Sequence, residues 1–159
     1  MPEKPPPPKA SDVEDPSRLV HFGGPIDRAC VALRLFGDSL DPDEITRLLG
    51  CQPTEARCKG DVLPDKRYHR IASTGVWHLK GTLPEKAEIE EQVLALLSTV
   101  TCDLQIWQRL TVELDVDIFC GVFLDTCNRG FCLSPHVTRM LSERGIGIGF
   151  DIYGHEDEC

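Results

Sequence analysis

Apolar residues alternate with other residues in several short segments, which is the pattern of a β-strand with one buried face. Residues 31–36, 76–80 and 146–153 show this alternation. A longer run begins at Val112, where apolar residues alternate with Glu113, Asp115 and Asp117, and continues to Leu124. We predict four strands, with a bulge or a change of phase at Gly121 in the longest one.

Three other segments carry apolar residues at helical spacing, over residues 42–49, 85–100 and 135–144. Asp41 is expected to cap the first helix and Gly50 to end it. Residues 104–110 fit two interpretations, a short helix capped by Asp103 or a direct lead into the following strand. Residues 51–74 are expected to form a long loop between the first helix and the second strand.

The strands have one polar face each, so helices need to cover only one side of the sheet. We therefore predict an α+β fold, a two-layer sandwich with one mainly antiparallel or mixed sheet and helices on one face. Leu40-Asp41-Pro42 and Leu133-Ser134-Pro135 occupy matching places between a strand and a helix. This match suggests two strand–helix–strand halves joined by the helix at 85–100.

The ends of the chain differ in composition from its middle. Residues 1–25 contain seven of the twelve prolines and are expected to form a disordered tail. Residues 26–154 are expected to form a single domain, and residues 155–159 a frayed acidic end. The chain shows neither the apolar run of a signal peptide nor that of a membrane span, which favours a cytoplasmic location.

The net charge of −9 disfavours a general nucleic-acid binder, which needs a dominant basic surface. The charge is uneven along the chain. Residues 51–80 hold six basic and three acidic residues, a net charge of +3, so the remainder carries −12. Such a separation bears on the choice of partners and not on the fold.

Several short motifs follow one another along the chain in a recognisable order. They are Leu35-Phe36-Gly37-Asp38, Leu40-Asp41-Pro42-Asp43-Glu44, Leu48-Leu49-Gly50, Pro53-Thr54, Lys59-Gly60-Asp61, Gly75-Val76-Trp77 and Asp151-Ile152-Tyr153. With these motifs, residues 28–154 resemble a bacterial family catalogued as domain of unknown function 4279. The resemblance implies a compact α+β domain and supplies no catalytic residues. The proline-rich tail and the eight cysteines lie outside it.

The first candidate site is the sheet face turned away from the helices. By alternation it carries Arg34, His78, Lys80, Glu113, Asp115, Asp117, Asp151 and Tyr153. Carboxylates on alternate residues of one strand lie about 7 Å apart, too far for one hard metal ion without help from a neighbour such as Asp151. A solvated face with cross-strand ion pairs is the favoured interpretation, and an acidic docking surface for a basic protein is an intermediate one.

The second candidate is the basic loop, with Arg57, Lys59, Asp61, Arg67 and Arg70 next to Trp77. These residues suit an anion, because cations hold its charge and Gly60 permits close approach of the backbone. The favoured alternative is that the cations cover the domain's own acidic surface and that Trp77 belongs to the core.

Sulfur and histidine chemistry receives less support. The cysteine groups, Cys51 and Cys58 with His69, and Cys120, Cys127 and Cys132, lack the spacing of zinc sites. Cys127 and Cys132 flank a turn and could form a disulfide. His21, His69, His78, His136 and His155 are scattered along the chain. No nucleophile lies in a catalytic motif, and no cofactor is expected.

The sequence thus favours a non-enzymatic protein-interaction module of the inhibitor or immunity type, with an unknown and possibly basic protein partner. The alternative is a domain that binds a small molecule, an anion or a metal, possibly an enzyme, with its site between the 51–74 loop and Trp77.

Overall fold

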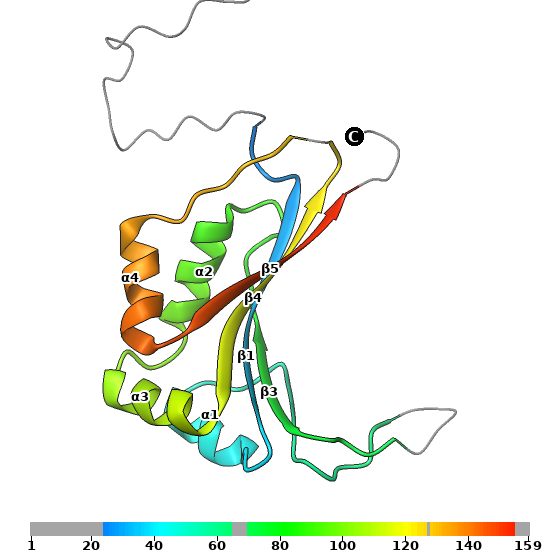
Figure 1. The fold of residues 1–159 in the computed structure, drawn as a ribbon, viewed down its shortest axis with the longest axis vertical. Helices are drawn as coiled ribbons and strands as arrows, with labels where there is room; N and C mark the ends of the chain where they lie inside the picture. Colours follow the sequence, from blue (N-terminus) through cyan, green and yellow to red (C-terminus); the bar gives the residue numbers. More distant parts are fainter. Residues whose placement is uncertain (1–23, 65–69, 127, 155–159) are drawn as a thin grey trace, which may run out of the picture.

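The computed structural model describes residues 24–64, 70–126 and 128–154. The predictions for the proline-rich tail and the C-terminal end, and those for Arg67, His69 and Cys127, fall outside these residues. Within them the chain forms one five-stranded sheet and four helices (Figure 1).

The strands are β1 (Arg28–Gly37), β2 (Glu55–Arg57), β3 (Gly75–Lys80), β4 (Asp115–Leu124) and β5 (Gly147–Gly154). Their order across the sheet is β2-β3-β1-β4-β5. The pairs β2–β3, β3–β1 and β1–β4 are antiparallel, whereas β4 and β5 are parallel. The sheet is therefore mixed, with β1 at its centre.

The helices are α1 (Pro42–Leu49), α2 (Ile89–Ser98), α3 (Leu104–Glu113) and α4 (Pro135–Arg144). They lie together on one side of the sheet (Figure 1). Between the two layers is one apolar core, in which Leu33, Leu35, Trp77, Trp107 and Ile118 are fully buried. This arrangement confirms the predicted two-layer α+β fold.

The ends of α1 follow from its sequence. The carboxylate of Asp41 accepts hydrogen bonds from the backbone N–H groups of Asp43 and Glu44, at 3.0 and 3.4 Å. These bonds satisfy two of the amides that the first turn of a helix leaves free. Gly50 ends the helix with φ of 77°, a left-handed conformation that glycine adopts without strain.

The predicted strand from Val112 begins too early. Residues 112 and 113 are the last turn of α3, and β4 begins at Asp115. Trp107, Leu110 and Leu114 are buried at helical spacing, whereas Val112 is 86% exposed. The alternating pattern over residues 112–114 therefore also fits the end of a helix. Of the two interpretations of residues 104–110, the helix is the correct one.

Two further expectations need correction. Gly121 pairs with Cys30 in regular register, so β4 has no bulge there. A Cβ at this position would lie 2.9 Å from the Cys30 sulfur, so the glycine makes room for the cysteine. The 51–74 connection is not without structure either, because it contains β2 and a bridge between Val62 and Ile71.

Candidate functional site

We call the sheet surface turned away from the helices the open face. On β1 the buried residues Ala29, Val31, Leu33 and Leu35 point to the helices, which leaves the alternate positions for the open face. The pairing then places Arg34 between His78 of β3 and Asp117 of β4. Three of the predicted residues thus meet at the centre of this face.

Arg34 and Asp117 form a bidentate ion pair. Nε donates to Oδ1 at 2.8 Å and Nη2 donates to Oδ2 at 2.6 Å. The guanidinium carbon lies 4.4 Å from the centre of the Phe119 ring and 5.5 Å from that of Phe36. The hydrogen bonds to Asp117 raise the pKa of Arg34 above its ordinary value, so this cation is charged and fixed in place.

His78 is the second polar residue of this group. Its ring meets the edge of Phe36 at 5.3 Å. The Nε2 atom is buried and has no hydrogen-bond partner among the described residues. Burial lowers the pKa of His78 below 6.5, and the nearby cations of Arg34 and Arg57 act in the same direction. The imidazole is therefore neutral at physiological pH.

The carboxylates of the open face do not converge. Asp115 lies opposite Phe36, and Asp151 lies beside Gly121 on the far strand. Glu113, expected on this face, belongs to α3 and pairs with Arg109. Among the described residues, no three His, Cys, Asp or Glu side chains lie close enough together to hold a metal ion.

Aromatic residues make up a part of the open face, of which the sequence predicted only Tyr153. Phe123 and Tyr153 stack with their ring centres 5.1 Å apart, and Arg28 lies 5.0 Å from the centre of the Phe123 ring. Phe36 and Phe119 flank Arg34. The signal was present for two of the others, because Phe36 and Phe119 stand two positions from Arg34 and Asp117, which were already assigned to the face.

A cavity of about 640 Å³ opens where β1 runs on past the end of β3. The segment that follows β3 runs beside β1 here. Two backbone hydrogen bonds hold it, from the N–H of Gly81 to the carbonyl of Val31 and from the N–H of Ala29 to the carbonyl of Glu85. Apolar groups form much of the wall: Ala29, Cys30, Val31, Ala32, Leu83, Pro84 and Phe119. This volume is in the range of sites for small organic molecules.

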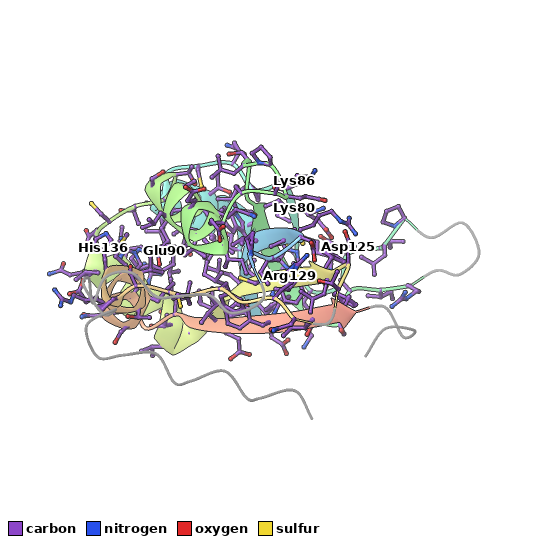
Figure 2. The ribbon with its side chains drawn as sticks, turned by 90° about the horizontal axis from the view of Figure 1, so that it is seen from above. Lys80, Lys86, Glu90, Asp125, Arg129 and His136 are labelled. Carbon is purple, nitrogen blue, oxygen red and sulfur yellow. The ribbon has the colours of Figure 1, made fainter. Side chains whose placement is uncertain are left out.

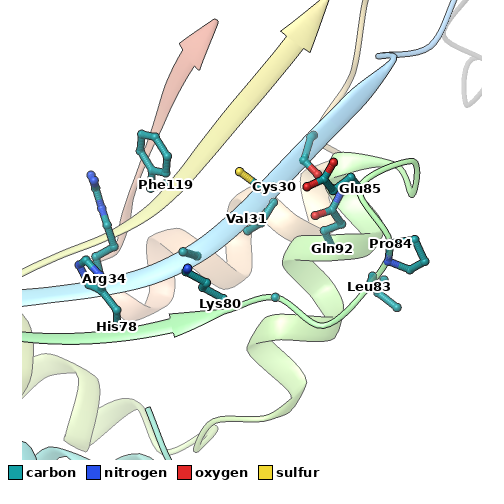
Figure 3. Close-up of a pocket in the computed structure, with 13 residues that line it drawn as sticks. Cys30, Val31, Arg34, His78, Lys80, Leu83, Pro84, Glu85, Gln92 and Phe119 are labelled. Atoms are coloured by element: carbon teal, nitrogen blue, oxygen red, sulfur yellow. The ribbon is translucent and has the colours of Figure 1, made fainter. Parts of the chain in front are cut away.

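The polar groups of the cavity are divided between its two ends. Figure 3 shows Arg34, His78 and Lys80 at one end and Leu83, Pro84 and Glu85 at the other. Lys80 is exposed and has no ion-pair partner within the described part of the chain. Glu85, in contrast, lies 3.6 Å from Arg28. One end is therefore cationic, whereas the other combines Leu83 and Pro84 with Gln92 and with Glu85, an acid that is paired with Arg28.

The groups of the basic loop pair within the domain itself. Lys59 binds Asp38, and Arg57 binds Glu55. The Asp61 carboxylate accepts a hydrogen bond from the backbone of Cys58 at 2.7 Å. Arg70 is exposed at the end of the described loop. Of the loop cations that the structure describes, Arg57 and Lys59 thus pair with the protein's own acids.

Trp77 does not face this loop. It is fully buried on the helix side of the sheet, and its indole N–H donates to Oγ1 of Thr46 in α1 at 3.1 Å. Trp77 is therefore not available to a ligand at this loop, because the alternation of β3 turns the indole into the core and His78 to the open face.

The buried thiol of Cys120 offers no nucleophile. It lies on the helix side of β4, and burial raises its pKa to about 12. At neutral pH it is therefore protonated, and the thiolate is the reactive form.

None of the helices in the described residues is both long and apolar enough to cross a membrane. No curated protein and no solved structure matches the chain. The model of the family described as domain of unknown function (DUF4279) matches residues 27–155, most of the chain, and the protein therefore belongs to this family.

Proposed function

We propose that the protein is a non-enzymatic binding module that holds a small organic anion with an apolar body in the cavity beside the end of β3. The observation that carries the proposal is the cationic end of the cavity, where Lys80 has no counter-ion among the described residues. A charge-assisted hydrogen bond from such a group is about twice as strong as a neutral one.

The division of the cavity favours one class of ligand. A carboxylate or sulfonate would meet Lys80 beside the fixed guanidinium of Arg34, and its apolar part would cover Leu83 and Pro84. Glu85 at the far end disfavours a second negative charge on the ligand. Monoanions with an aliphatic or aromatic body therefore fit this cavity better than dianions.

The cavity offers little for catalysis. Nε2 of His78 is buried within the protein, so this nitrogen does not present a base to a ligand. Arg34 remains charged under all ordinary conditions and is held by Asp117. We therefore assign the site to binding and place no reaction in it.

The experiment is a titration with anilinonaphthalene sulfonate, an apolar monoanion, and with octanoate as its competitor. We expect K80Q to weaken binding about tenfold, the effect of losing a hydrogen bond to a charged group. K86Q is the matched control, because Lys86 is an exposed lysine outside the cavity wall (Figure 2). Equal affinities in the two variants, or a wild-type protein that binds neither probe, would contradict the proposal.

A second candidate is the protein-interaction module, supported by the net charge of −9 and by the exposed Asp115 and Asp151 on the open face. The cations Arg34, Arg57 and Lys80 on the same face weaken its acidic character. A basic protein captured from a bacterial host at low salt and released at moderate salt would support this candidate. For both candidate functions, anion binding and protein interaction, we propose a cytoplasmic location.

A further inference from the structure

The outer strand β5 forms an edge of the sheet that nothing in the described chain covers. It pairs only with β4, and its other side bears no strand (Figure 1). Its eight residues span about 26 Å of free backbone N–H and C=O groups. Such an edge is a template for a further strand unless the sequence protects it.

The two edges of the sheet differ in their protection. The opposite edge, β2, has only three residues, and its Glu55 and Arg57 carry charge. β5 has neither proline nor lysine, and its one charged residue, Asp151, points to the open face. The absence of edge protection in β5 indicates a partner strand.

Apolar groups along β5 also remain uncovered. Ile152 is 60% exposed although it points to the helix side, and Tyr153 is 51% exposed on the open face. On the same open face, Gly147 and Gly149 have nothing within 4 Å of an added Cβ. The edge therefore offers large residues near one end and open space near the other.

We propose that two copies of the protein pair antiparallel through β5, with Phe150 on the two-fold axis. Residues directly opposite each other in an antiparallel pair point to the same side. This register keeps the helices of both copies on one side of a continuous sheet. It also gives an interface in which both copies use the same surface, as closed dimers require.

The register is self-complementary in size. Tyr153 lies opposite Gly147 of the second copy, so its ring can extend the stack with Phe123 over a bare backbone. Ile152 lies opposite Ile148 of the second copy, which covers its exposed side chain. Large residues thus meet small or apolar ones along the whole contact.

The register is also favourable in charge. Asp151 lies opposite Gly149 of the second copy, so the two carboxylates are not placed face to face. A register centred on residue 151 would oppose them directly, which destabilises a strand pair. A register centred on residue 149 would pair a shorter part of the strand. The inference does not depend on the cavity or its ligand.

Sedimentation equilibrium of the full chain tests the proposal. The wild type is expected to form dimers in the micromolar range, and I152K to weaken the dimer at least about tenfold, because it replaces the apolar contact with Ile148 of the second copy by an unpaired charge. V112K is the matched control, since Val112 is also apolar and exposed but lies on α3. Dimerisation should strengthen with salt, because each copy carries a charge of −9.

The register has its own test. G149K places a cation opposite Asp151 of the second copy twice per dimer, so it should tighten the dimer several-fold. The additional change D151N should remove this gain. Circular dichroism shows whether I152K folds. If it does not, the dimer affinity of G149K still tests the proposed pairing.

A wild type that is monomeric throughout the micromolar range overturns the proposal, and so does a dimer that I152K and V112K affect equally. A monomer that instead takes up a strand from another protein overturns the pairing of two copies. A dimer that G149K leaves unchanged or weakens overturns the register.

Discussion

The imidazole of His78 lies among charged groups of both signs. Glu55 and Asp117 raise its pKa, whereas Arg34 and Arg57 lower it, and burial, the largest influence, lowers it further. The net result is a pKa below 6.5. Protonation of this residue therefore opposes folding.

We expect the free energy of unfolding to fall as the pH drops from about 7 to about 5. Between the lowered pKa and 6.5 the unfolded chain binds more protons than the folded one, so stability rises with pH in this window. H78Q should flatten this part of the profile. H136Q is the matched control, a substitution of an exposed histidine on α4 (Figure 2). Urea denaturation across the window provides the measurement, and parallel profiles for the two variants would contradict this account.

Side-chain alternation predicts which face a residue occupies but not what it meets there. The sequence assigns Arg34, His78 and Asp117 to the same face, and the structure places them there. Their contact depends on the register between strands distant in the chain, which periodicity does not contain. The cavity also depends on register. It forms where β1 extends beyond the end of β3 and the segment after β3 runs beside β1.

Among the elements, α1 depends most visibly on its first residue. D41A should lower the free energy of unfolding by about 1 kcal/mol, since two backbone N–H groups lose their acceptor. D41N keeps a capping oxygen and should have a much smaller effect. Thermal or urea denaturation of both variants measures the difference, and equal losses would show that the cap contributes little.

Helix boundaries were predictable where capping residues mark them. Asp41 and Ser134 accept hydrogen bonds from the first turns of α1 and α4, as expected from their sequence. The junction of α3 and β4 lacks such a signal, and its alternating residues fit both elements. β2 was missed because three residues, Glu55–Arg57, are too few to show a period.

At the scale of the whole molecule, the two predicted halves are present but pair differently. After α1 the chain returns in β3 antiparallel to β1, whereas after α4 it returns in β5 parallel to β4. The elements follow from local patterns, but the direction of return depends on the length and path of each crossover. The sequence therefore predicted a mixed or antiparallel sheet without its strand order.

The two halves share one core, with Trp77 in the first half and Trp107 on α3, which packs against β4 and α4 of the second. Trp77 of β3 packs on the helix side near α1, and Trp107 of α3 donates its indole N–H to the backbone of Thr101 at 2.8 Å. Both are fully buried. Because β1 pairs with strands of both halves, we expect the chain to unfold as one cooperative unit.

The variants W77F and W107F each leave one tryptophan as a local reporter of a different half. Each is expected to lower the free energy of unfolding by about 1–3 kcal/mol, since a buried ring shrinks and a hydrogen bond is lost. Within each variant, however, the urea midpoint from fluorescence should coincide with that from circular dichroism. A fluorescence midpoint that departs from the circular dichroism midpoint in either variant would mean that the halves unfold separately. The continuous core would then not couple them, despite the central place of β1 in the sheet.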